Sequence, residues 1–206
     1  HKNKMNTYFY APKEDICHRL CWKQQYSNKW RLRFKNFIQF SKKYNIDVIV
    51  GIAPGLDYNF KELHDISGDN QNSDFHLLLK KAKQLLEDGA NSIALMLDDI
   101  PDDFKKKFGV DVSEGTYHGI LANKFSKELE QNIFFVPRIY ADELIKDNPS
   151  YLKDLRKILN PDIKIFYCGK NVVAETFKNK ERIKKILPNE IIFWDNFYAN
   201  DYCPRR

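Results

Sequence analysis

The sequence predicts an α/β fold built on parallel strands. Six short segments rich in β-branched and aromatic residues alternate along the chain with segments of helical periodicity, an order typical of a parallel sheet. A polar or aromatic cluster follows each predicted strand. Because the carboxyl ends of parallel strands meet at one edge, these clusters would ring one mouth of a (β/α) barrel. Eight strands close such a barrel, so we expect a (β/α)8 barrel of the TIM type, truncated to about six strands.

The first half of the chain supplies two strands and two helices. Residues 5–10 are rich in β-forming side chains and are followed by Pro12, which predicts a strand. Aromatic and aliphatic residues at near-helical spacing predict an amphipathic helix over residues 29–44. The apolar run 47–52, ended by a Pro-Gly pair, predicts the second strand. Leucines at helical spacing then predict a helix over residues 75–87.

The third predicted strand, residues 92–97, ends in the adjacent carboxylates Asp98 and Asp99. In folds with parallel strands, the carboxyl end of a strand is where ligands bind. Two like charges beside an apolar core disfavour each other's ionisation, so we expect one carboxylate and one protonated acid. Acid-assisted bond cleavage needs this division. For an isolated Asp-Asp pair, the alternative is a solvated acidic turn.

The remaining elements follow from the same periodicities and turn signals. A long polar and charged connection, residues 101–116, separates them from the third strand. They are helices over residues 117–130, 151–159 and 178–186, and strands over residues 133–136, 163–167 and 191–194.

Composition excludes several classes of protein. The 206 residues are 43% hydrophobic, enough for a sizeable core in one domain. The net charge of +6 comes from lysines spread along the chain without a basic stripe, so we expect no nucleic-acid partner. Charged residues interrupt every apolar run, so we expect no membrane span. No glycine-rich phosphate loop follows the first strand, and a nucleotide cofactor is not expected.

The cysteines give no metal site. Their spacing contains no paired ligand motif, so we expect neither a metal nor another cofactor. Free thiols favour a reducing compartment, and no signal segment follows His1, which favours the cytoplasm. The chain does not begin with Met, so its localisation stays unassigned. The four cysteines are Cys17, Cys21, Cys168 and Cys203.

Five stretches carry a family pattern. They are Asn6 to Lys13, His18-Arg19 with Trp22 and Tyr26, Pro54 to Asp57, Asp98 to Ile100, and Trp194 to Asn196 continuing through Tyr202. In these stretches and in their order, the chain resembles the catalytic barrel of glycoside hydrolase family 84, the β-N-acetylglucosaminidases that include O-GlcNAcases. The resemblance runs from the second barrel strand to the loop after the seventh. It implies that residues 1–206 are a single, partial catalytic barrel domain and an internal fragment of a longer enzyme.

The resemblance implies a retaining exo-β-N-acetylglucosaminidase that removes terminal β-linked N-acetylglucosamine, from protein Ser/Thr or from glycans, by substrate-assisted catalysis. The substrate's own acetamido oxygen would attack the anomeric carbon and form an oxazoline. Asp98 would orient the acetamido group and stabilise the charge that grows on its nitrogen. Asp99 would protonate the leaving oxygen and then activate water. Neighbours on a regular strand point to opposite faces, so the strand must end or bulge at this pair.

The resemblance also implies five substrate-binding residues. Lys13 matches the lysine whose loop lines the sugar pocket; without the resemblance it would be an ordinary surface lysine. Tyr140 matches the tyrosine that reaches the acetamido group and the oxazoline. Trp194 matches an aromatic residue of the pocket wall, where a pyranose face can stack, and is otherwise a core residue. Asn196 and Asp201 match residues that bind the reaction centre and the sugar hydroxyls.

Two loops depart from the family pattern. Arg138-Ile139 replaces the usual Thr-Glu before the tyrosine, which changes the hydrogen bonds behind that loop. Tyr167-Cys168 stands where the family has Trp-Thr, so the aromatic wall is kept only in part. We interpret His18 as a structural hydrogen-bonding residue rather than a catalytic one, and His118 likewise.

Other functions remain open on the same fold. The first alternative is a non-catalytic sugar-binding or scaffold module, because fold does not fix function. An enzyme that acts inside hyaluronan chains fits less well, because the implied pocket takes a single terminal sugar. The expected partner is a β-linked N-acetylglucosaminide, carried by a glycoprotein or a glycan. Oligomeric state stays unassigned.

Overall fold

The computed structural model describes residues 4–64, 72–108, 113–173 and 180–196. The chain divides into two compact units, the first formed by His1–Met96 with Phe125–Ile133 and the second by Leu97–Lys124 with Phe134–Arg206. The expectation of a single partial barrel domain over residues 1–206 stays a prediction. One predicted site residue, Asp201, lies outside the described residues.

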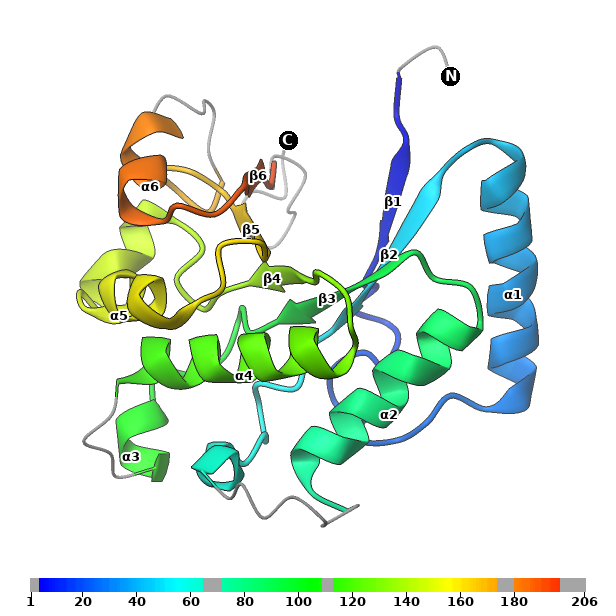
Figure 1. The fold of residues 1–206 in the computed structure, drawn as a ribbon, viewed down its shortest axis with the longest axis horizontal. Coiled ribbons are helices and arrows are strands. Elements are labelled where there is room, and N and C mark those ends of the chain that lie inside the picture. Colours follow the sequence, from blue (N-terminus) through cyan, green and yellow to red (C-terminus); the bar gives the residue numbers. More distant parts are fainter. Residues whose placement is uncertain (1–3, 65–71, 109–112, 174–179, 197–206) are drawn as a thin grey trace. The chain divides into compact units, whose positions relative to one another are not determined.

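The first unit contains three parallel strands paired in chain order (Figure 1, blue to green). In the register of these strands Thr7 pairs with Asp47, and Ile49 pairs with Ser92. Parallel connections need crossovers, and helices supply them. The elements are β1 (Thr7–Tyr10), α1 (Asn28–Lys43), β2 (Asp47–Ile52), the short 3-10 helix η1 (Phe60–His64), α2 (Asp74–Glu87) and β3 (Ser92–Met96).

Burial explains why the central strands of this unit are continuous apolar runs. In β2 all residues after Asp47 are buried, and in β3 all residues after Ser92 are buried, as in sheets covered on both faces. The helix α2 places Leu78, Ala82 and Leu85 at 0% exposure, which is the face predicted from its leucine spacing.

The second unit repeats the pattern with three further parallel strands paired in chain order (Figure 1, green to red). Phe134 pairs with Lys164, and Ile165 pairs with Ile191. The elements are α3 (Phe104–Phe108), α4 (Glu114–Glu128), β4 (Phe134–Val136), the 3-10 helix η2 (Asp142–Lys146), α5 (Tyr151–Ile158), β5 (Lys164–Tyr167), α6 (Lys180–Ile186) and β6 (Ile191–Phe193).

The predicted strands and the longer helices are all present, with ends that agree to within three residues. The prediction for residues 101–116 is wrong, because this stretch holds the short helix α3 and the start of α4. Phe104 is 5% exposed and packs against the rings of Tyr117 and His118, with centroids 5.5 and 5.7 Å apart. The lysines that follow Phe104 show no helical periodicity of apolar residues in the sequence. The packing of Phe104 against Tyr117 and His118 therefore accounts for this short helix.

Within the described ranges, no helix is long and apolar enough to cross a membrane. The same ranges contain no group of three or more His, Cys, Asp or Glu side chains that could hold a metal ion.

Helices α4 and α5 meet at a histidine–tyrosine contact with no exposed surface. The Nδ1 atom of His118 lies 2.8 Å from the hydroxyl of Tyr151, and both side chains are 0% exposed. The backbone N–H of Arg138 donates to the same hydroxyl at 3.2 Å. Burial, followed by the charge of Arg138, lowers the pKa of His118 to about 3. The imidazole is therefore neutral and shares a hydrogen bond with the Tyr151 hydroxyl, which matches its interpretation as a structural residue.

Gly115 lets α4 approach α5 closely. A Cβ added at Gly115 would lie 2.2 Å from the backbone oxygen of Tyr151, whereas one added at Gly119 would lie 3.2 Å from the Cγ2 methyl of the Ile158 side chain. We expect Gly115→Ala to lower the free energy of unfolding by about 1–3 kcal/mol, because the backbone of Tyr151 cannot move aside as the Ile158 side chain can. Gly119→Ala is the matched control and should cost much less, since alanine also favours the helix. Urea unfolding checks this; equal costs for both substitutions would contradict it.

His118 predicts a loss of stability in acid. Its pKa is depressed in the folded protein, so its contribution is complete above the ordinary value of 6.5 and is lost as pH falls from there toward about 3. At pH 5 the loss is about 2 kcal/mol, from 1.36 kcal/mol for each pH unit. His118→Gln keeps an acceptor for the Tyr151 hydroxyl and removes the titration. Urea unfolding at pH 7 and pH 5 should show a smaller difference in this variant, and an unchanged difference would contradict the assignment.

Candidate active site

The strand β3 ends at Met96, so the two acids lie beyond it. Asp99 has a φ of 53°, in the left-handed region that aspartate tolerates better than most residues. This turn ends the alternation of a strand, as the pairing of two neighbouring acids in one site requires. Backbone in sparsely populated regions concentrates at functional sites. The predicted end of the strand at the acid pair is therefore confirmed.

The two carboxylates lie in different environments. Asp98 is 8% exposed and follows the buried Leu97, whose backbone N–H donates to the oxygen of Val136 in β4 at 2.8 Å. Asp99 is exposed. Asp98 is thus shielded from water, whereas Asp99 is open to water and to a ligand.

Tyr140 contacts the exposed acid. It follows β4, and its hydroxyl donates to Oδ1 of Asp99 at 3.1 Å. Its backbone oxygen accepts from the N–H of Cys168 at 2.7 Å, which ties its loop to the end of β5. Burial, then the charge of Asp99 and this hydrogen bond, raise the pKa of Tyr140 far above its ordinary value. The phenol therefore stays a hydrogen-bond donor in neutral solution.

The loop after β6 supplies two further predicted residues. The half-buried Trp194 packs on a small cluster that includes Ala141 and Cys168, and Tyr140 packs on the same cluster. Its backbone N–H donates to the oxygen of Tyr167 at 3.0 Å. The side-chain amide of Asn196, also half-buried, lies 3.5 Å from Sγ of Cys168. Five predicted site residues are therefore part of the second unit, on the segments that follow β3, β4 and β6: Asp98, Asp99, Tyr140, Trp194 and Asn196.

The predicted residue Lys13 belongs to the first unit, where it is exposed on the loop after β1. Its role in the site stays a prediction. On the same loop, His18 is 3% exposed and its Nδ1 lies 2.9 Å from the backbone oxygen of Gly51. Burial lowers the pKa of His18, so this imidazole is neutral and structural.

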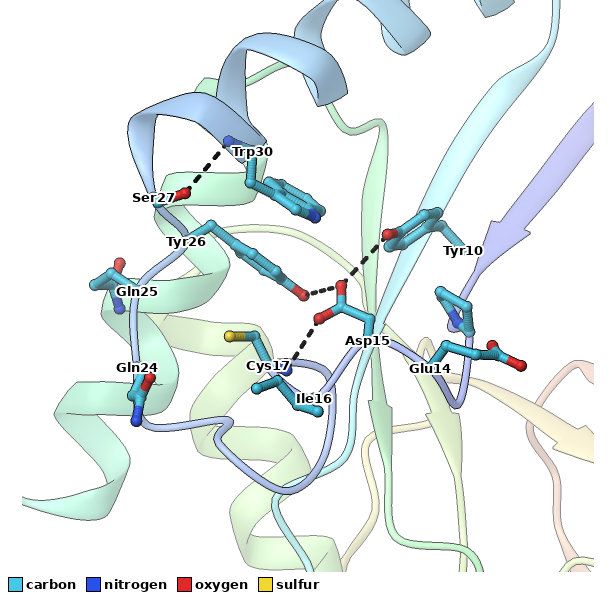
Figure 2. A pocket seen from close by; sticks show the side chains of 11 residues that line it. Tyr10, Glu14, Asp15, Ile16, Cys17, Gln24, Gln25, Tyr26, Ser27 and Trp30 are labelled. Atoms are coloured by element: carbon cyan, nitrogen blue, oxygen red, sulfur yellow. Dashed lines mark hydrogen bonds between the residues drawn. The ribbon is translucent and has the colours of Figure 1, made fainter.

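A cavity of about 560 Å³ opens in the first unit beside this loop (Figure 2). The hydroxyls of Tyr10 and Tyr26 converge on Asp15, donating to its Oδ2 at 3.3 and 2.9 Å. Trp30 stacks on Tyr26 with centroids 3.6 Å apart. The Asp15 carboxylate and the Trp30 ring therefore already contact other side chains of the protein. Residues of β1, of the loop that follows it and of α1 line the cavity. Neither Lys13 nor the acid pair lines it.

Two residues lie behind the Tyr140 loop. The sequence marked Arg138 as a departure from the family pattern and did not point to Glu114. Arg138 and Glu114 form a buried ion pair, with exposures of 6% and 1%. The sign of a buried ion pair in the sequence was Arg138, which stands shortly after a strand where the family pattern has a smaller residue. Its partner lies 24 residues earlier, at the start of α4. Nothing in the local pattern connects the two.

Cys168 should resist alkylation in the folded protein. It is 1% exposed, and burial, then the charges of Asp98, Asp195 and Asp99, raise the pKa of its thiol to about 12. At pH 8 about one molecule in ten thousand would carry the reactive thiolate. Peptide mapping after iodoacetamide should find Cys168 unmodified in native protein and modified in urea. Equal modification under both conditions would show that the thiol is open to solvent.

The whole chain, residues 1–206, matches the family model described as beta-N-acetylglucosaminidase. The Protein O-GlcNAcase of Mus musculus is 29% identical over 213 residues, which cover 100% of this chain and 22% of that protein. The Protein O-GlcNAcase of Rattus norvegicus has the same identity and coverage. The chain therefore spans 22% of the length of these curated relatives.

Solved structures agree. The structure of CpGH84B superposes with a TM-score of 0.81 at 26% identity, covering 97% of this chain and 35% of that chain. A mutant of the Thermobaculum terrenum O-GlcNAc hydrolase gives a TM-score of 0.81 at 24% identity, covering 97% and 42%, and supports the fold. The α/β fold of TIM-barrel type, represented by six of its strands, is confirmed. The chain belongs to the β-N-acetylglucosaminidases of glycoside hydrolase family 84.

Proposed function

We propose that the protein containing this chain is a retaining exo-β-N-acetylglucosaminidase. It would remove terminal β-linked N-acetylglucosamine, as O-GlcNAc on protein Ser/Thr or as GlcNAc on glycans, through an oxazoline intermediate. One observation carries the proposal: a buried acid, Asp98, stands next to an exposed acid, Asp99, whose carboxylate already accepts a bond from Tyr140. This is the division of environments that two different roles require.

Asp98 is proposed to act on the acetamido group. Attack by the acetamido oxygen on the anomeric carbon places positive charge on the acetamido nitrogen, and the bond to the leaving oxygen breaks. A carboxylate that is 8% exposed can accept the N–H and stabilise this charge without strong screening by water. No enzyme nucleophile is then required, which is the known exception to the two-carboxylate scheme.

Asp99 is proposed as the general acid and base. Its proton passes to the leaving oxygen in the first step, and in the second step the carboxylate takes a proton from the water that opens the oxazoline. An exposed position gives access to both the leaving group and water. Tyr140 would then donate toward the acetamido group or the oxazoline, a role that suits a phenol whose pKa is raised.

The remaining predicted residues would hold the sugar. Trp194 offers an aromatic surface on the hydrophobic cluster that Tyr140 also contacts, and the amide of Asn196 lies near Cys168 of that cluster. Lys13 and Asp201 are proposed to complete the pocket by analogy with the family motif.

The test is hydrolysis of an aryl β-N-acetylglucosaminide and of an alkyl glycoside by the complete protein. We expect Asp98→Asn to lower kcat/KM for both substrates by about 10²-fold or more, since the stabilised charge forms with either. Asp99→Ala should harm the alkyl glycoside by about 10²–10⁴-fold and the aryl glycoside less, because an aryl leaving group needs little protonation.

Equal losses on both substrates for Asp99→Ala would contradict its role as the acid. A folded, complete protein that binds N-acetylglucosamine without hydrolysing either glycoside would support the non-catalytic sugar-binding module instead. Asn91→Ala, on the turn before β3, is a control for general effects on folding, since Asn91 contacts only the backbone of Val48 and the side chain of Asp47 in the contacts described.

A further inference from the structure

A buried ion pair stands behind the loop that presents Tyr140. Nε and Nη2 of Arg138 donate to the two carboxylate oxygens of Glu114 at 2.6 and 2.7 Å. Neither residue was assigned a role by the family pattern. We propose that the Glu114–Arg138 pair is a positioning device that holds the Tyr140 hydroxyl on the carboxylate of Asp99. Its effect on catalysis rests on the proposed function, whereas its effect on the Tyr140–Asp99 contact does not.

The pair is built to fix geometry. A two-pronged arginine–carboxylate contact restricts orientation as well as distance. Asn148 donates to Oε2 of Glu114 at 3.1 Å, so this oxygen accepts two bonds. Glu114 also lies in the first turn of α4, where the helix dipole favours a negative charge. The carboxylate is therefore held by Asn148 and by the helix start as well as by Arg138.

Arg138 joins the two loops that carry the contact. Its Nη2 also donates to Asp102 at 3.1 Å, three residues beyond Asp99 on the loop after β3. Its own backbone lies two residues before Tyr140 on the loop after β4, with the fully buried Ile139 between them. Arg138 thus links the loop that carries Tyr140, through its own backbone, to the loop that carries Asp99, through the bond to Asp102. The Asp102 arm is half exposed and contributes less than the buried arm.

The far side of the Tyr140 loop is held separately. Ala141 forms an isolated bridge with Gly169, and the N–H of Asp142 donates to the oxygen of Gly169 at 2.9 Å. With Cys168 bonded to the backbone of Tyr140, this side is fixed to the end of β5. On its other side the loop is held at Arg138, by the backbone N–H bonded to Tyr151 and by the guanidinium bonded to Glu114.

Stability alone does not account for the pair. Taking two charges out of water costs about as much as their attraction returns, and replacing a buried pair by apolar residues of similar volume is often neutral or stabilising. Removing one partner, by contrast, leaves a buried charge without its counterion. Apolar residues cannot reproduce the directional hydrogen bonds of an ion pair. Here these bonds are made by Arg138, at the start of the loop that carries Tyr140.

The test is the double variant Glu114→Met with Arg138→Met in the complete protein. Methionine approximates the volume of both side chains and leaves no buried charge. We expect folding and the urea midpoint to be retained. With an aryl β-N-acetylglucosaminide, kcat should fall by about 10- to 100-fold, as for a reacting group displaced by roughly 1 Å, while KM changes little.

A second readout does not depend on activity. Tyr140 faces Asp99, Asp98 and Cys168, which together with burial keep it protonated. At about pH 11, one unit above the ordinary pKa of tyrosine, Tyr140→Phe should not change the tyrosinate absorbance of the parent protein. In the double methionine background the same substitution should remove up to about one tyrosinate per chain, because the released ring leaves both its partly buried surrounding and the acid. Circular dichroism verifies that each protein is folded at this pH.

The matched control is another two-pronged pair, Arg31 with Asp88 in the first unit, with both bonds at 2.7 Å. Arg31→Met with Asp88→Met should leave kcat and the Tyr140 titration unchanged. A folded Glu114–Arg138 double variant with parental kcat and no new tyrosinate would overturn the proposal.

Two other outcomes are distinguishable. If the parent protein is inactive, the proposed function fails, and the tyrosinate readout still decides whether the pair holds Tyr140. If the methionine variant does not fold, Glu114→Gln with Arg138→Gln carries the same two readouts, because it also removes both charges together.

Discussion

Parallel pairing is the constraint on which the candidate site depends. Because β4, β5 and β6 run in the same direction and pair in chain order, the loops after them begin at one edge. The hydrogen bond from Leu97 to Val136 brings the end of the acid-bearing segment to the same edge. Residues distant in sequence, such as Asp99 and Tyr140, therefore come within hydrogen-bond distance without any local sequence signal.

The chemistry of the site comes from a contrast in burial over two neighbouring residues. Asp98 continues the direction of a buried strand, and the left-handed backbone at Asp99 turns the chain toward solvent. One short turn thus gives two identical side chains different surroundings. The aromatic and thiol groups around them, Tyr140 and Cys168, both have raised pKa values because they share this partly buried, acidic surrounding.

In each unit a buried polar group holds a loop. In the first unit Lys81, at 0% exposure, donates to the backbone oxygen of Gln24 and holds the loop between β1 and α1; burial lowers its pKa to about 8. In the second unit, the Glu114–Arg138 pair holds the loop after β4. Such groups cost desolvation energy, and what they supply is one defined loop conformation.

The sequence by itself determined the strands, the long helices, the family and the position of the acid pair at the end of a strand. These features are local: an apolar run, a helical period or a motif is complete within a few residues. The helix α3, the α4–α5 contact at Gly115 and the ion pair of Glu114 with Arg138 were decided only by tertiary structure. A charge is buried, or a short helix held, when elements far apart in sequence pack around it. That packing energy has no counterpart in the pattern of any single segment.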